Sequence, residues 1–346
     1  EYVKHFGETS SAWADFIATC STLRPKYNGL VFNEHLIDKT DFHAPTDDAF
    51  ADICEELSED NSPWDFNAIA IEILGSIYER FLGKVVQLSG RGVLVKEKPE
   101  VRKAGGVYYT PQSIVRYIVE NTVGKAFEGK SPSQIADLRI ADISCGSGSF
   151  LIAAFDLLLR YHEAWYNSNV RPESERRNVV HETPHGNVLT LNAKRRILLN
   201  NIYGVDIDAQ AVEVTQMSLY LRLLEDETLA SLREQELQSH ETVLPSLASN
   251  IKYGNSLVEP DFESGSLFPA EQQRELNAFS FKSAFSKIVV DHKVFDIIVG
   301  NPPYLFITEV PEEYRRYYEG KYSSLEYRFD LYGAFIERSV RELLKV

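Results

Sequence analysis

The sequence has few cysteines, and Cys20, Cys54 and Cys145 are far apart. Their spacing fits neither a disulfide framework nor a zinc site, which excludes small disulfide-rich folds and zinc modules. Isolated cysteines are typical of reduced thiols, so we expect a cytoplasmic protein.

Long hydrophobic runs are also missing. No apolar stretch approaches the roughly 20 residues that a helix needs to cross a bilayer, and no signal peptide is visible. The chain begins at Glu1 without a methionine, and we therefore expect it to be a piece of a longer protein.

Basic residues are in deficit, with 36 Lys and Arg against 51 Asp and Glu and a net charge of −15. This balance argues against a surface built uniformly for nucleic acid. It leaves room for a local basic groove, or for DNA contacts made by a part outside this chain.

What is present is an ordinary globular composition, with 346 residues, 44% hydrophobic and 25% charged. That length suffices for about two domains. Residues 1–85 have the pattern of helices, clearest in "FNAIAIEILGSIYERFLGKVV", where apolar residues recur at three- and four-residue steps. A Gly-rich connector with a short strand at residues 92–96 follows. We predict an N-terminal helical domain over residues 1–100 and a catalytic domain over residues 101–346.

The second part alternates strands and helices. "LRIADIS", "NIYGVDID", "NIKYGNSL" and "VFDIIVG" have the pattern of short buried strands, and apolar helices such as "SFLIAAFDLLLRYH" lie between them. This order predicts an α/β fold with a parallel sheet covered by helices on both faces. Ligands bind at the carboxyl ends of such strands, so the residues that follow each strand are the candidates for a site.

The first candidate is "ADISCGSGSF", where Asp142 ends a strand and Gly146 and Gly148 turn the chain into a helix. Glycines let a ligand lie against the backbone, although a plain strand-to-helix turn has the same local pattern. The dinucleotide fingerprint requires a third glycine at the position of Leu151. A pyrophosphate at this helix is therefore disfavoured.

The next two strands end in polar residues. Asp206 stands where a carboxylate can accept hydrogen bonds from both hydroxyls of a ribose, and Asp208 is placed to cap the following helix. Asn255 could bind an adenine edge through its side chain, but on local grounds a turn asparagine explains it better.

The fourth strand ends in Asn301-Pro302-Pro303-Tyr304. Prolines lack the N–H that a strand ladder needs, so the carbonyl oxygen of Pro302 is left free of the ladder. Asn301 offers a second acceptor, the oxygen of its side chain. Two acceptors can hold the two hydrogens of one aromatic amine and direct its lone pair towards attack. Tyr304 offers a flat ring on which the base could stack.

Taken in order, "GGVYYTPQSIVRYIV", "ADISCGSGSFL", "IYGVDID", "YGNSL", "FDIIVGNPPY" and "FDLYGAFIERSV" resemble the S-adenosylmethionine-dependent DNA adenine-N6 methyltransferases of bacterial restriction–modification systems, with the gamma-type motif order. The resemblance covers roughly residues 60–346 and implies a Rossmann-like class I methyltransferase sheet. It is greatest to type IIG fused restriction–modification enzymes and to type I modification subunits. The partners it implies are double-stranded DNA with a flipped adenine, and recognition and nuclease parts outside this chain.

The resemblance also implies site residues. Those at the methionine end of S-adenosylmethionine are Tyr109, Thr110 and Pro111, and those in the loop around it are Asp142, Ser144, Gly146 and Gly148. Asp206 matches the ribose acid, Ile207 the residue that packs on the cofactor adenine, and Asn255 the residue that binds its amino group. The catalytic tetrapeptide is Asn301, Pro302, Pro303 and Tyr304. No metal is expected.

The sequence departs from the family in places. Ile143 and Ser144 replace the usual Pro and Ala of the first motif, and Asn255 is an amide where a carboxylate is more usual. Too few residues separate Asn255 from Asn301 for a recognition domain. We therefore expect that domain, and the last strands of the sheet, to lie beyond this chain.

Other interpretations stay open. An Asn-Pro-Pro-Tyr enzyme could act on a protein glutamine or an RNA guanine, and an inactive scaffold could bind the cofactor alone. Pro260-Asp261 with Asp291-His292-Lys293 resembles a nuclease core but lies in a loop between motifs. His181 and His185 have a spacing that could suit a metal, although a polar loop fits them better.

Overall fold

The computed structural model describes residues 12–24, 46–57, 73, 84–89, 92–97, 110–169, 172, 176, 178–184, 186–227, 243–260, 277–289, 294–310, 312–325 and 330–345. The chain divides into two compact units, one of Glu1–Ile73 with Asp226–Ser246 and the other of Leu74–Glu225 with Leu247–Val346. The domain boundary expected near residue 100 stays a prediction.

The described part of the first unit contains helices α2 (Ala12–Leu23) and α3 (Asp47–Glu56). The side chain of Thr46 caps α3 by accepting a hydrogen bond from the amide of Ala49, as expected of a hydroxyl residue before a first helical turn. Rings of Trp13, Phe16 and Phe50 join the two helices, with centroids 5.2–5.5 Å apart. Aromatic packing thus supplies the contact between them.

The long helix predicted to start at Phe66 lies mostly outside the described residues, and its predicted end is wrong. Residues from Lys84 belong to strand β1 (Lys84–Ser89), which pairs antiparallel with β2 (Gly92–Glu97). Neighbouring valines at 85 and 86 favour a strand, and the pairing with β2 outweighs the helical periodicity of the preceding residues. The short strand expected at residues 92–96 is confirmed.

The second unit is built on a parallel sheet, as predicted. Its strands are β3 (Ile140–Asp142), β6 (Ile202–Asp206), β7 (Ile251–Tyr253) and β8 (Ile297–Ile298), in the order β7-β6-β3-β8. β8 is shorter than the strand expected over residues 295–299. The amide of Val299 still donates to the carbonyl of Ala141 (2.9 Å), and Phe295 pairs in parallel with Leu344 on the far side of β8.

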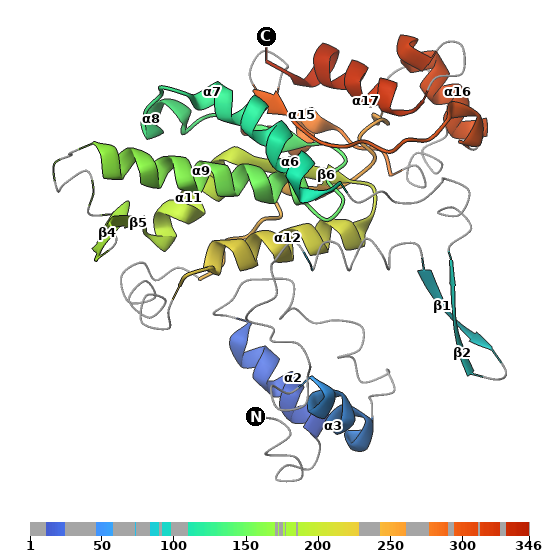
Figure 1. Ribbon diagram of the computed structural model, residues 1–346. Coiled ribbons are helices and arrows are strands. Elements are labelled where there is room, and N and C mark those ends of the chain that lie inside the picture. Colours follow the sequence, from blue (N-terminus) through green and yellow to red (C-terminus); the bar gives the residue numbers. More distant parts are fainter. Residues whose placement is uncertain are drawn as a thin grey trace. The chain divides into compact units, whose positions relative to one another are not determined.

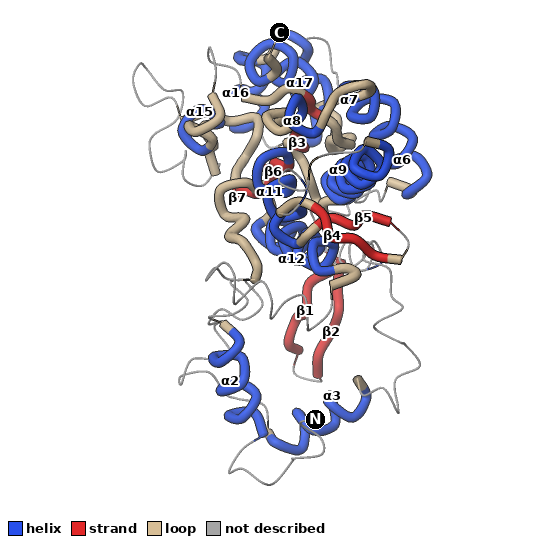
Figure 2. Tube along the Cα trace, turned by 90° about the vertical axis from the view of Figure 1, so that its left-hand side faces the viewer, coloured by secondary structure: helices blue, strands red, loops and turns tan. Residues whose placement is uncertain are grey.

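Different helices cover the two faces of this sheet (Figures 1 and 2). One layer consists of α6 (Gln112–Val119), α9 (Ser149–Ser168), α11 (Leu191–Asn201) and α12 (Ala209–Leu224), and the other of α15 (Phe281–Ala284), α16 (Glu312–Lys321) and α17 (Tyr332–Arg338). Shorter elements are η3 (Glu120–Gly124), α7 (Lys125–Phe127), α8 (Pro132–Ile135), η4 (Ile307–Glu309), η5 (Ser323–Leu325) and η6 (Ser339–Leu343). In β6, Gly204 faces Leu151 of α9, whereas the side chain of Tyr203 belongs to the core on the opposite face of the sheet. This is the alternation that strand geometry requires.

The core on that opposite face is rich in aromatic rings. Phe279, Phe281, Phe285 and Phe295 are all buried, and the ring of Phe285 lies 5.4 Å from that of Phe295 and 6.1 Å from those of the other two. Edge-on contacts of this kind add to the stabilisation from apolar burial. The segment after β7 is thereby fixed against β8, the strand that precedes the Asn-Pro-Pro-Tyr motif.

A hairpin lies between α9 and α11, formed by β4 (Val180–Thr183) and β5 (Gly186–Leu189). The polar loop expected around His181 is therefore wrong, because His181 pairs with Val188 in this ladder. His185 lies outside the described residues. Within the described part of the chain, no group of His, Cys, Asp and Glu could hold a metal ion.

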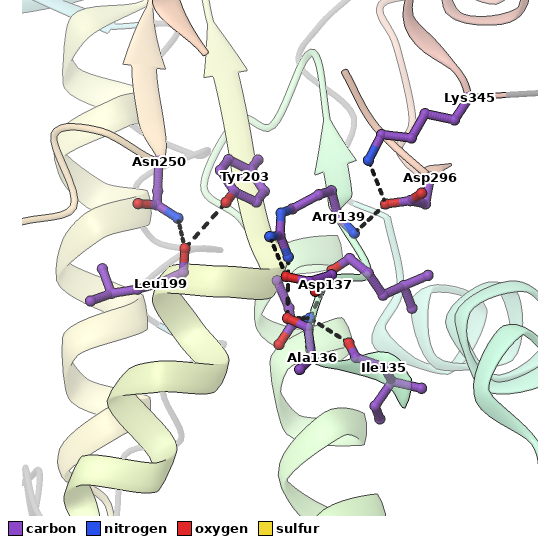
Figure 3. A network of polar contacts seen from close by, with 11 residues as sticks. Ile135, Ala136, Asp137, Arg139, Leu199, Tyr203, Asn250, Asp296 and Lys345 are labelled. Carbon is purple, nitrogen blue, oxygen red and sulfur yellow. Dashed lines mark hydrogen bonds and ion pairs between the residues drawn. The ribbon is translucent and has the colours of Figure 1, made fainter. Parts of the chain in front are cut away.

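Polar side chains hold the amino ends of the strands together (Figure 3). The carboxylate of Asp296 accepts from the backbone amide of Arg139 (2.7 Å) and from Nζ of Lys345 (3.2 Å). Nδ2 of Asn250 donates to the carbonyl of Leu199 (2.8 Å). These side chains stabilise the fold, so the candidate site residues are those at the opposite, carboxyl ends of the strands.

In the described residues we find no helix long and apolar enough to cross a membrane.

Candidate active site

The four predicted strand-end residues lie at one edge of the sheet. Asp142 and Asp206 end β3 and β6, and Asn255 and Asn301 follow β7 and β8. Parallel pairing brings the carboxyl ends of these strands together. Because β3 is central, Asp142 lies between the strand that leads to Asp206 and the strand that leads to Asn301. This edge is the candidate active site.

A glycine loop follows β3 and is fastened to β6. The amide of Cys145 donates to the carbonyl of Val205 (3.1 Å), and the amide of Gly146 donates to Oδ2 of Asp206 (2.8 Å). The hydroxyl of Thr215 on α12 donates to the carbonyl of Gly146 (2.8 Å). The loop is therefore held from two elements before any ligand arrives.

Two glycines give the loop its shape. Gly146 and Gly148 have φ of 53° and 86°, in the left-handed region that side chains disfavour. A Cβ on Gly148 would also lie 2.8 Å from Cγ2 of Thr215. Gly148 thus permits both the turn into α9 and the close approach of α12.

Asp206 uses both carboxylate oxygens within the protein. Oδ2 accepts from Gly146, and Oδ1 accepts from the amide of Asp208 (2.9 Å). Burial raises the pKa of Asp206, and the two amide hydrogen bonds oppose that rise. Each carboxylate oxygen has two lone pairs, so the group can still accept from ribose hydroxyls. The side chain of Asp208 accepts from Gln210 and caps α12 as predicted.

Apolar side chains are exposed beside Asp206. Ile207 is 58% exposed, and Tyr253, which pairs with Asp206 in the β6–β7 register, is 52% exposed. Such surface next to a half-buried carboxylate suits a nucleoside, with its ring on the apolar groups and its sugar on the acid. Tyr253 was not singled out from the sequence, although its place one strand from Asp206 could have indicated it.

Asp142 is a buried carboxyl group, with only 2% of its surface exposed. Its Oδ1 accepts a hydrogen bond from the amide of Ser144 (3.0 Å). Burial, together with the nearby charge of Asp206, raises the pKa of Asp142 from 3.8 to about 7, and hydrogen bonding from Ser144 opposes that rise. A Cβ on Gly300 would lie 2.5 Å from Oδ1. A glycine before Asn301 is thus what lets Asp142 lie directly against the motif.

The Asn-Pro-Pro-Tyr motif is held at both ends. Before it, Val299 completes the pairing with β3, and after it the amide of Leu305 donates to Oδ1 of Asp330 (3.0 Å). Nδ2 of Asn301 donates to Oγ1 of Thr110 (3.0 Å). No described residue donates to Oδ1 of Asn301 or to the carbonyl oxygen of Pro302. Among the described residues, the two acceptors expected from the sequence thus have no donor.

The ring of Tyr304 is accessible, being 56% exposed. Among the described residues, its ring pairs with that of Tyr332 at the start of α17, with centroids 5.8 Å apart and planes at 52°. Tyr332 is itself 40% exposed. The two rings form an aromatic surface next to Asn301, and only the three-dimensional fold reveals the second ring.

Not every predicted residue presents free groups to the site. Asn255 is buried, its Oδ1 accepts from Leu257 (3.0 Å) and its Nδ2 donates to the hydroxyl of Tyr318 (3.3 Å). These contacts fit a turn asparagine, but Oδ1 keeps a second lone pair and Nδ2 a second hydrogen, so the expected binding of adenine by Asn255 stays a prediction. Tyr109 lies outside the described residues, whereas Pro111 directly precedes α6.

Cys145 is buried under this loop, and burial raises the pKa of its thiol well above the usual value. A thiol that resists ionisation is a poor nucleophile. Its burial therefore argues against Cys145 as a catalytic nucleophile.

Comparison with known proteins gives a family match for part of the chain. The model of the Eco57I restriction-modification methylase family matches residues 200–346, which include Asp206, Asn255 and the Asn301 motif. Residues 200–346 belong to the Eco57I restriction-modification methylases. The Escherichia coli type II restriction enzyme and methyltransferase RM.Eco57I is 32% identical over 99% of this chain. The chain spans only 32% of the length of that relative.

Other relatives agree with the Eco57I assignment. The adenine-specific methyltransferase PglX of Streptomyces coelicolor is 24% identical over 60% of the chain, which covers 15% of its length. Among solved structures, the type IIL restriction-modification enzyme MmeI in complex with DNA matches 99% of the chain and 42% of its own, with a TM-score of 0.52 and 14% identity. That likeness, together with the parallel sheet, confirms the predicted α/β methyltransferase-type fold.

Proposed function

We propose that this chain carries the catalytic centre of a DNA adenine-N6 methyltransferase of a restriction–modification system. The observation that carries the proposal is the open acceptor pair at the end of β8. Oδ1 of Asn301 and the carbonyl of Pro302 accept no hydrogen bond from a described residue, and they lie beside the accessible ring of Tyr304. Family membership and an adenine-specific relative support it.

S-adenosylmethionine is the proposed cofactor, and the residues present fit it. The glycine loop leaves backbone room, Asp206 retains lone pairs for two hydroxyls, and Ile207 offers an apolar face. When bound, the cofactor supplies an electrophilic methyl group. Asp142 ends β3 at the same edge, and its carboxylate, when ionised, would hold the methionine ammonium.

The reaction needs a poor nucleophile to be activated. The lone pair of an aromatic amine is delocalised into its ring, and acceptors on both of its hydrogens favour a geometry in which the lone pair turns out of the plane. Asn301 and Pro302 provide these acceptors from a rigid strand end. Tyr304 stacks on the base and holds it in place, so the centre acts mainly by positioning.

The target must leave the duplex to reach this centre, at a cost of a few kcal/mol. DNA recognition and nuclease activity are assigned to parts outside this chain, since the relatives are much longer. Pro260 is the only described member of the sequence resembling a nuclease core, and no cleavage function is proposed here.

Transfer of labelled methyl groups tests the proposal. The intact protein is incubated with labelled S-adenosylmethionine and, in parallel, with duplex DNA, RNA and protein, and the modified base is identified. N6-methyladenine in DNA is expected, and Asn301→Ala should lower turnover about 10²–10³-fold. Label in RNA guanine or protein glutamine instead would overturn the assignment, and cofactor binding without transfer would indicate an inactive scaffold.

A further inference from the structure

The hydroxyl of Thr110 contacts the motif from a distant part of the chain. Nδ2 of Asn301 donates to Oγ1 of Thr110 at 3.0 Å, across 191 positions of sequence. Thr110 directly precedes Pro111, whose carbonyl accepts from the amides of Ile114 and Val115 in the first turn of α6. The hydroxyl is thus placed by the start of a helix that packs on α9.

This contact affects whether the oxygen or the nitrogen of the Asn301 amide faces a substrate. The oxygen and nitrogen ends of an amide have nearly the same shape, but only the oxygen accepts hydrogen bonds. If Nδ2 faced an amine, two donors would oppose each other. In the productive orientation Nδ2 points away from the amine and needs an acceptor of its own, because an unmade hydrogen bond of a partly buried donor is unfavourable.

We propose that Thr110 is a positioning residue whose hydroxyl accepts from Nδ2 of Asn301 and so keeps Oδ1 turned towards the target amine. The inference rests on the proposed function. It differs from the cofactor contact that the family resemblance implies for Thr110, because here the residue acts through Asn301. A hydroxyl suits this task because it can accept, whereas a methyl group of the same size cannot.

The test separates orientation from cofactor binding. Thr110→Val keeps the shape and removes the acceptor, and Thr110→Ser keeps the acceptor. We expect Thr110→Val to lower kcat about 10–100-fold, as for a small misplacement of a reacting group. Affinity for S-adenosylmethionine, measured by calorimetry, should change less than about twofold, and Thr110→Ser should restore most of kcat.

Two further variants sharpen the result. Thr122→Val removes a hydroxyl of η3 that donates to the carbonyl of Ile118 in the adjoining α6 (2.7 Å). This control variant should behave like the parent. In a double-mutant cycle, adding Thr110→Val to Asn301→Ala should cause no further loss, since the amide it orients is gone.

The outcomes are distinguishable. If the parent protein does not methylate adenine in DNA, the proposed function fails. If the parent is active but Thr110→Val has the parental kcat, the inference fails alone. Equal losses of cofactor affinity and turnover, with effects that multiply in the double variant, would assign Thr110 to the cofactor and overturn its role through Asn301.

Discussion

At the scale of single residues, Tyr304 offers its ring rather than its hydroxyl. The side chain is 56% exposed, and no described residue bonds to its oxygen. Tyr304→Phe should therefore keep most DNA binding and turnover. Tyr304→Ala should weaken DNA binding by about 1–3 kcal/mol, the usual contribution of a stacked base. Binding titrations and initial rates with the intact protein check this, and equal damage from both substitutions would contradict it.

The raised pKa of the buried Asp142 makes the free energy of unfolding depend on pH. Burial raises its pKa from 3.8 to about 7 in the folded chain. Between these values the folded state holds a proton that the unfolded state releases, so this group lowers the free energy of unfolding as pH rises from about 4 to 7.

Asp142→Asn should remove this dependence. The amide can still accept from Ser144 through its oxygen, but it does not ionise. Since one pKa unit corresponds to about 1.4 kcal/mol, the variant should be the more stable protein at pH 8, by up to about 4 kcal/mol. Denaturant unfolding at several pH values measures it. The same slope in parent and variant would show that Asp142 titrates normally.

At the scale of elements, the turn from β3 into α9 depends on Gly148. Its φ is 86°, and a Cβ would meet Thr215 at 2.8 Å. Gly129 is a matched control, because its φ is 72° and a Cβ there would have no described neighbour within 4 Å. Gly129→Ala should lower the free energy of unfolding through backbone strain alone, by about 1–3 kcal/mol.

Gly148→Ala should lower the free energy of unfolding more than Gly129→Ala does, because it displaces α12 in addition to straining the backbone. It should also weaken cofactor binding, since Thr215 holds the carbonyl of Gly146. Thermal unfolding and calorimetry of the two variants give the comparison. Similar losses of stability in both would mean that the contact with Thr215 relaxes freely.

At the scale of the whole molecule, the net charge of −15 limits contact with DNA. Non-specific binding draws on phosphate contacts and typically has a dissociation constant of about 10⁻⁴–10⁻⁶ M. We expect this 346-residue chain alone to bind duplex DNA no more tightly than that, and without sequence preference. Fluorescence titrations with several duplexes at physiological salt test it, and tight binding to one sequence would contradict it.

The order of the chemical residues could be predicted from the sequence. Strands alternate with helices, and a polar residue ends each strand, so parallel pairing had to bring Asp142, Asp206 and Asn301 to one edge. These features are local or periodic, and neighbouring residues along the chain determine them. The same reasoning failed at Lys84, where pairing with β2 overrode a helical pattern.

Only the tertiary structure decided which partner each of these side chains contacts. Nothing near Thr110 in the sequence indicates Asn301 as its partner, and nothing near Gly148 indicates Thr215. The local sequence around Asn255 likewise does not indicate that its amide contacts Leu257 and Tyr318. The sequence alone determined which groups reach the carboxyl edge of the sheet. Which of them remain free to bind depends on contacts between distant segments, and only packing fixes those contacts.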